Sequence, residues 1–138
     1  MKLLNLSSSP HLHHPDSTTG VMLDVIIALI PATICGIYLF GFHAALIVAV
    51  CVASAVIAEY LWCLILKKPQ PVKDLSAVLT GLILSLNLPG TLPLWMAALG
   101  SVIAIVIVKQ MFGGLGQNFA NPALTARIVL MVSFPSYM

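Results

Sequence analysis

The sequence predicts an all-α integral membrane protein, and three observations carry that prediction. Of the 138 residues, 60% are hydrophobic and only 7% are charged, whereas a soluble domain carries roughly 25% charged residues. The mean hydropathy is +1.08. The apolar residues also fall into long runs between short polar stretches, which is typical of membrane spans. The six basic and four acidic side chains are too scattered to form a basic patch, so nucleic-acid binding is not expected.

The apolar runs divide the chain into an arm and one membrane domain. Residues 1–20 form a polar arm, and residues 21–138 form the membrane domain. A helix needs about 20 predominantly apolar residues to cross a bilayer. Spans are therefore expected at about 21–40, 44–66 and 92–112, with a short element at 75–88 and a partial span at 122–134. The arm holds an H-x-H-H cluster, but no Cys or second His pair accompanies it, so a solvated arm is preferred to a metal site.

Two carboxylates, Asp24 and Glu59, fall inside the expected spans. Asp24 lies near the start of its span, where the helix dipole favours a negative charge. Glu59 lies in the last third of the second span, beside Tyr60 and Trp62, which fit an interfacial aromatic belt. An interfacial role and a functional role at membrane depth both stay open for Glu59. The sequence identifies no partner for either carboxylate.

The lysines give the expected orientation. Residues 67–74, KKPQPVKD, carry three lysines, and the positive-inside rule assigns such a connection to the cytoplasm. The N-terminus is then cytoplasmic as well. If residues 75–88 cross the membrane, Lys109 and Arg127 also face the cytoplasm, whereas a re-entrant element would put both outside. We expect the crossing, because it keeps every Lys and Arg on one side.

The short element at 75–88 has one polar, small-residue side that includes Thr80. Its helical part covers only about 20 Å at the rise of an α-helix. Short or broken elements of this kind line the sites of transporters, which makes Thr80 a candidate binding residue. Close helix packing through small side chains is the alternative interpretation.

Residues 113–127, GGLGQNFANPALTAR, interrupt the hydrocarbon with the most polar stretch of the membrane domain. Gly113 and Gly114 allow a ligand or a neighbouring helix to approach the backbone closely. Asn118 and Asn121 offer amide donors and acceptors that suit the mixed edge of a heterocycle, and Asn121 also fits the N-cap of the helix that follows. The alternative is a membrane-surface loop with a helix cap.

The polar side chains beyond this loop need a covering. Asn118 and Arg127 would face lipid unless other protein lies against them. We therefore expect the chain to be one half of a larger unit, or to dock with partner subunits.

Three stretches carry a resemblance to a known family. They are SSSPHLHHPDSTTGVMLDVIIALIPA at 7–32, LSAVLTGLILSLNLPGTLPLWMAALG at 75–100, and KQMFGGLGQNFANPALTARIVLMVSFP at 109–135. Together they resemble the amino-terminal part of the RnfD/NqrB family, the membrane subunits of the Rnf ferredoxin:NAD oxidoreductase and of the sodium-pumping NADH:quinone reductase. The short arm favours the Rnf member. The resemblance implies a urea-transporter-like bundle of two inverted five-helix repeats, of which this chain would hold most of the first.

The resemblance also implies flavin. The family carries FMN esterified to the threonine of an S-[GA]-A-T type motif, and NqrB-like members hold a non-covalent riboflavin-type flavin. No such motif occurs in the chain, and Thr125 follows Leu124 rather than the required small residues. The covalent attachment threonine is therefore expected beyond Met138. We expect Gly113, Gly114, Asn118, Asn121 and Thr80 to contribute to a flavin site.

Three functions from different classes follow from these observations. The preferred one is a subunit of an ion-translocating electron-transport complex in the cell inner membrane, which would help to hold flavin and couple electron transfer to Na⁺ or H⁺ movement. Its partners would be the other membrane, flavin and iron-sulfur subunits. Its reaction would be a redox-driven translocation, which this chain alone would not catalyse. The alternatives are a urea-transporter-like solute channel without a cofactor and a structural membrane subunit.

Overall fold

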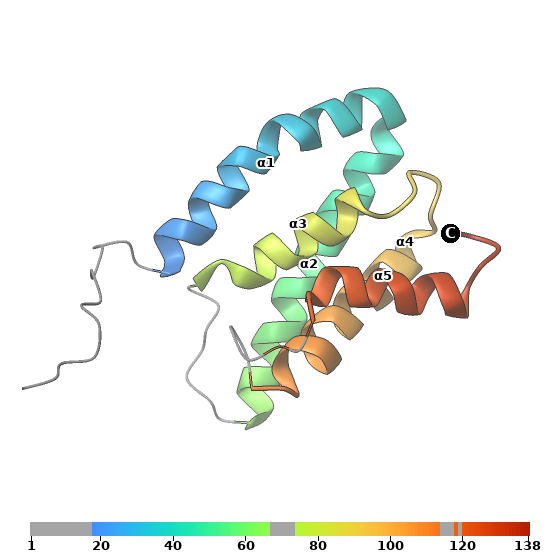
Figure 1. Ribbon diagram of the computed structural model, residues 1–138. Helices are drawn as coiled ribbons and strands as arrows, with labels where there is room; N and C mark the ends of the chain where they lie inside the picture. Colours follow the sequence, from blue (N-terminus) through green and yellow to red (C-terminus); the bar gives the residue numbers. More distant parts are fainter. Residues whose placement is uncertain (1–17, 67–73, 114–117, 119) are drawn as a thin grey trace, which may run out of the picture.

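The computed structural model describes residues 18–66, 74–113, 118 and 120–138 (Figure 1). The longer helices in this part of the chain are α1 (Thr18–Phe40), α2 (Phe42–Leu66), α3 (Ser76–Leu86), α4 (Leu94–Val102), the π-helix η2 (Ile103–Gln110) and α5 (Pro122–Ser133). No strand occurs among these described residues, which confirms the all-α prediction. The helices fall where the apolar runs predict them. The polar arm up to residue 17 and the lysine-rich connection at 67–73 lie outside the described residues.

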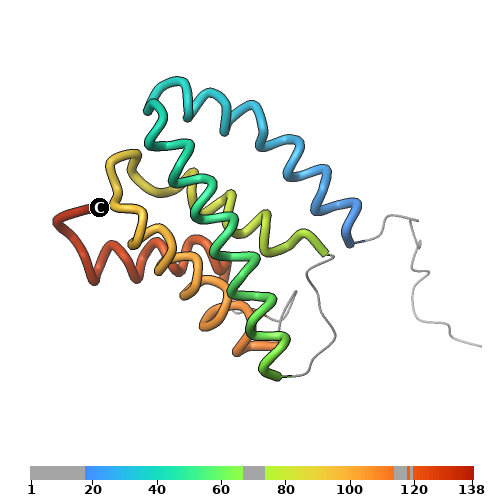
Figure 2. The backbone as a smooth tube through the Cα atoms, turned by 180° about the vertical axis from the view of Figure 1, so that it is seen from behind, coloured from blue at the N-terminus to red at the C-terminus, as the bar shows by residue number. Residues whose placement is uncertain are grey.

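Helices α2 and α3 lie at the centre of the arrangement. Helix α1 contacts α2 and α3, whereas α5 contacts α3, α4 and η2 on the other side. Figures 1 and 2 show α1 and α2 meeting at one end as a hairpin and diverging toward the other. A single residue, Gly41, separates the two helices, and its φ of +79° is a conformation that favours glycine.

A glycine lets α2 and α3 approach closely. A Cβ atom built on Gly81 would lie 2.8 Å from the Cys51 carbonyl oxygen and 2.9 Å from the Val52 Cα. The backbones therefore touch directly, which is the close packing that small residues allow between membrane helices. The polar side of the 75–88 element thus includes one position used for packing.

The apolar core lies between α2, α3, α4 and α5. Its fully buried members are mostly aliphatic or small, and they include Ile47, Cys51, Leu84, Leu92, Met96, Ala97, Ala104, Ala123, Ala126 and Leu130. Small side chains at α2, α3 and η2 extend the packing toward the other end of α2. Helix α1 contributes no buried residue to this core.

Helix α3 runs antiparallel to α2, and α4 with η2 returns in the opposite direction. At one end, the His43 ring Nδ1 lies 2.9 Å from the Gly90 carbonyl oxygen, so the turn after α3 sits at the start of α2. At the other end, Ser76 and Lys109 lie against Glu59 near the end of α2. This is the arrangement that a crossing at 75–88 requires, and the sides of the membrane stay a prediction.

Two helices of the described chain, α1 and α2, are long and apolar enough to cross a membrane. Helices α3 and α5 and the α4–η2 segment are shorter but apolar. Many large apolar side chains on α1, α2 and α5 are exposed to the surroundings. Such a surface suits a lipid environment or contact with further protein.

Candidate functional site

Three of the residues predicted from sequence lie around one cavity. Thr80, Asn118 and Asn121 come from α3, the loop after η2 and the start of α5, and they line a cavity of about 140 Å³. The complete lining is Met22, Ser76, Leu79, Thr80, Ile83, Lys109, Asn118, Asn121 and Pro122. The cavity therefore joins residues of α1, α3, η2 and α5. We call it the Asn118 cavity.

Asn121 shapes the entrance of α5. Its Oδ1 atom accepts from the backbone N–H groups of Ala123 at 3.0 Å and Leu124 at 3.4 Å, so the predicted N-cap is confirmed. Pro122 occupies the first helical position, where its missing N–H is not needed. The side-chain oxygen is committed to the cap, and the N–H₂ group of Asn121 is the part suited to a ligand.

The hydroxyl groups of α3 face the same cavity. Thr80 Oγ1 donates to the Ser76 carbonyl oxygen at 2.8 Å, so its lone pairs are the part that could accept from a ligand. Ser76 follows Leu75, a residue with φ of +57°, which is uncommon for a side chain of this size. The chain thus enters α3 through a strained residue directly before the cavity wall.

Gly113 lies outside the cavity lining. It ends the turn after η2, where its N–H donates to the Gln110 carbonyl oxygen at 3.3 Å. Its φ of +110° gives a conformational reason for glycine at this position. Contact of Gly113 with a ligand stays a prediction, and Gly114 lies outside the described residues.

A buried polar cluster stands directly behind the Asn118 cavity. The Lys109 ammonium donates to Glu59 Oε1 and, at 2.7 Å, to Ser76 Oγ. Gln110 Nε2 donates to the same Glu59 oxygen at 2.8 Å. The side chains of Lys109 and Glu59 are 3% and 0% exposed. The interfacial interpretation of Glu59 is therefore wrong, because this carboxylate is fully enclosed and paired.

The π-helix brings two consecutive side chains onto Glu59. An α-helix turns about 100° per residue, so neighbours in sequence point in different directions. In η2 the helix is wider, as the hydrogen bond from Met111 N to Val106 O at 3.1 Å illustrates. Lys109 and Gln110, the last residues of η2, both reach the carboxylate. Isolated π-turns are frequent at functional sites, which adds interest to this segment.

Sequence reasoning misses this cluster. It treats Lys109 as a charge on the cytoplasmic side, but the side chain is buried and therefore carries no weight in a count of loop charges. The available signal is that two spans each hold one ionisable residue toward the same end. Glu59 Oε2 is buried and has no hydrogen-bond partner among the described residues.

Arg127 takes part in a separate polar contact. Its Nη1 donates to Asn87 Oδ1 at 3.2 Å, and both residues line another cavity of about 290 Å³ at the far end of α3. This contact gives Arg127 a protein partner in place of the lipid that the sequence alone would leave it facing.

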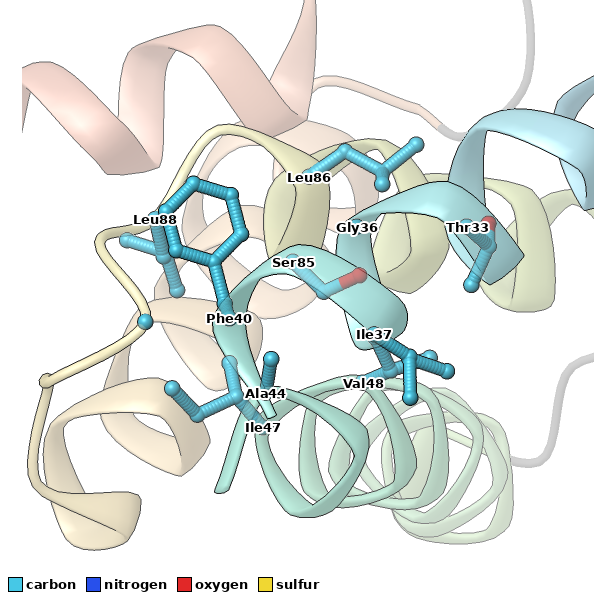
Figure 3. Close-up of a pocket in the computed structure, with 11 residues that line it drawn as sticks. Thr33, Gly36, Ile37, Phe40, Ala44, Ile47, Val48, Ser85, Leu86 and Leu88 are labelled. Carbon is cyan, nitrogen blue, oxygen red and sulfur yellow. The ribbon is translucent and has the colours of Figure 1, made fainter. Parts of the chain in front are cut away.

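The cavity between α1, the start of α2 and the end of α3 is small and apolar (Figure 3). It measures about 60 Å³, and Phe40 and Leu88 stand side by side at its edge. Its two hydroxyls already donate within their own helices, from Thr33 to Leu29 O and from Ser85 to Leu82 O. We interpret it as a packing gap. No group of three His, Cys, Asp or Glu residues that could hold a metal occurs in the described chain.

These features define an all-helical membrane protein with a polar cavity backed by a buried ion pair. The model of the NQR2, RnfD, RnfE family matches residues 5–138, and the chain belongs to this family.

Curated relatives agree with this assignment, and the three described here are D subunits of oxidoreductase complexes. The chain is 53% identical over 135 residues to that of the Na(+)-translocating ferredoxin:NAD(+) oxidoreductase complex of Acetobacterium woodii, covering 98% of the chain and 42% of the relative. It is 44% identical over 136 residues to that of the proton-translocating ferredoxin:NAD(+) oxidoreductase complex of Clostridium ljungdahlii, covering 99% and 41%. It is also 44% identical over 137 residues to that of the ion-translocating oxidoreductase complex of Yersinia enterocolitica, covering 98% and 39%. The chain spans about two fifths of the length of these relatives.

Proposed function

We propose that this chain forms part of the membrane subunit of an Rnf-type complex that passes electrons from ferredoxin to NAD and moves Na⁺ or H⁺. The names of the relatives support this function. One relative is named for Na⁺ and another for protons, so both ions belong to the proposal. The complex would lie in the cell inner membrane, with the arm in the cytoplasm. The partners would be the other membrane, flavin and iron-sulfur subunits.

Within this complex, the Asn118 cavity would hold a non-covalent, riboflavin-type flavin. The observation that carries the proposal is the convergence of Thr80, Asn118 and Asn121, from separate parts of the chain, on one cavity. Amides, hydroxyls and an ammonium together match the donors and acceptors of a heterocycle edge or a ribityl chain.

The size of the cavity limits what it can enclose. Sites for small molecules usually measure about 300–1,000 Å³, and this cavity measures about 140 Å³. It therefore fits one edge or the ribityl chain of a flavin, with the rest of the molecule reaching beyond these walls. The flavin would supply the redox chemistry, and the protein would position it and adjust its electronic environment.

The five helices would form most of the first of two inverted repeats, with the second in the rest of the protein. The covalent FMN would be attached to a threonine beyond Met138. We propose no solute channel, since a buried ion pair and a cavity with amide groups fit cofactor binding better than passive conduction.

The test of the flavin site uses the purified whole complex. Asn118→Leu removes the amide but keeps a side chain of similar size, and we expect loss of one non-covalent flavin from a complex that still assembles. Asn87→Leu is the matched control, because it makes the same change at the far end of α3, in a different cavity. The measurement is flavin released by acid and quantified by chromatography. A full flavin complement in Asn118→Leu would refute the site, and a visible spectrum without flavin bands would refute the class of function.

A further inference from the structure

We infer that Lys109 is the positive charge that stabilises the reduced, anionic form of the ligand in the Asn118 cavity, and that Glu59 limits its strength from behind. This inference rests on the proposed flavin site and adds the residues that would adjust its redox potential. It begins from the lining of the cavity. Among the described residues of that lining, Lys109 is the one with a full charge.

The geometry puts the ammonium between the carboxylate and the cavity. Lys109 and Ser76 belong to the lining, whereas Glu59 does not. The carboxylate therefore holds Lys109 from the side opposite the ligand. A charge in such a position acts on the ligand without being consumed by a direct ion pair with it.

Burial makes this charge effective. Lys109 is 2% exposed and Glu59 is 0% exposed, so water screens neither of them well. Coulomb interactions are several times stronger at the effective dielectric constant of a protein than in bulk water. A buried ion pair gives little net stability over apolar side chains of the same volume. The pair is therefore better explained by what it does to a neighbouring charge than by folding.

Two neighbours fix the position of the ammonium. Ser76 Oγ accepts from Lys109 at 2.7 Å, and Gln110 Nε2 donates to Glu59 Oε1 at 2.8 Å. The Gln110 contact offsets part of the negative charge on the oxygen that Lys109 uses. Glu59 Oε2 has no partner among the described residues, so the carboxylate is incompletely neutralised. Both features adjust how much positive potential reaches the cavity.

The sign of the effect follows from the charge change on reduction. Two electrons and one proton convert an oxidised flavin ring into a reduced ring with one negative charge. A positive charge nearby favours that product and raises the midpoint potential. Lys109→Met is therefore expected to lower the midpoint, and Glu59→Gln is expected to raise it. The double variant Lys109→Met with Glu59→Gln has neither charge, and its midpoint should lie between those of the two single variants.

The experiment is a reductive titration of the purified whole complex, with dithionite as electron donor and water as proton source. The flavin that disappears in Asn118→Leu identifies the relevant signal. A tenfold change in the relative affinity for the reduced and oxidised forms moves a two-electron midpoint by about 30 mV. We expect at least that shift in each single variant, with opposite signs. Ser76→Ala should give a smaller downward shift, because the ammonium stays but loses one fixed contact.

The outcomes separate this inference from the site it rests on. Retained flavin with an unchanged midpoint in both single variants overturns the role of Lys109 and leaves the site intact. If Lys109→Met loses its flavin, the upward shift in Glu59→Gln and the intermediate double variant decide the matter. Shifts of the same sign in both single variants, or loss of flavin from both, overturn the inference. A full flavin complement in Asn118→Leu refutes the proposed site itself, before any titration.

Discussion

The Lys109 ammonium and the Glu59 carboxylate form a buried ion pair between side chains that lie 50 residues apart. The pair joins η2 to the last third of α2. It also connects the cavity lined by Asn118 to the central helix of the fold. The position of α2 and the charge beside the cavity are therefore set by the same contact.

The first prediction concerns the stability of this pair. Removing one partner by Lys109→Ala leaves Glu59 buried without its counter-charge, and such changes cost about 3–5 kcal/mol. The double variant Lys109→Met with Glu59→Gln removes both charges and should cost much less. Thermal unfolding of the purified complex in detergent measures the difference. Equal losses in the single and double variants would contradict the role of the pair.

The second prediction concerns the contact between α2 and α3. Gly81→Ala puts a methyl group within 2.8 Å of the Cys51 carbonyl oxygen. Overpacking of this kind costs about 1–3 kcal/mol, so a lower unfolding temperature is expected. Gly36→Ala is the control, because no atom lies within 4 Å of its added Cβ. There the change should be neutral or stabilising by about 0.5–1 kcal/mol. A Gly81→Ala protein as stable as Gly36→Ala would argue against close backbone contact.

The third prediction concerns the start of α5. Asn121→Ala removes the side-chain oxygen that caps two backbone N–H groups, at a cost of about 0.5–2 kcal/mol. Asn121→Asp keeps that oxygen and adds a negative charge where the helix dipole favours it. Hydrogen exchange at Ala123 and Leu124 should therefore accelerate in the alanine variant and stay slow in the aspartate variant. Identical exchange in both would show that the cap contributes little.

The fourth prediction concerns orientation. Single cysteines at Lys73 and Gln117 should resist labelling from outside sealed right-side-out vesicles, because both segments are expected in the cytoplasm. The native Cys35, Cys51 and Cys63 are first replaced by alanine. Thr91 is exposed in the turn at the opposite end of α3, so a cysteine there should react from outside. Outside labelling at Gln117 would support the re-entrant arrangement of residues 75–88.

The helices and one cap can be predicted from the sequence because their causes are local. Apolar runs of the right length mark α1 and α2, and Asn121 followed by Pro122 marks the start of α5. Residue chemistry and the family resemblance also suggest a common site for Thr80, Asn118 and Asn121. Their meeting at one cavity depends on the return of the chain through α4 and η2.

The ion pair and the π-helix cannot be predicted in this way. A lysine at the end of an apolar run fits both a cytoplasmic boundary and a buried partner, and the sequence offers no means to choose. Glu59 is equally ambiguous beside Tyr60 and Trp62. The wider turn of η2 has no signal in residue propensities, since its apolar residues also fit an α-helix. Only the packing of η2 on α2 decides these features.

The single-residue link at Gly41 has a consequence for biogenesis. Because α1 ends at Phe40 and α2 begins at Phe42, no loop is long enough to let one helix enter the bilayer while the other waits in water. The two helices must leave the translocon as one hairpin. A bulky side chain at Gly41, where φ is +79°, would therefore disturb insertion before any tertiary contact forms.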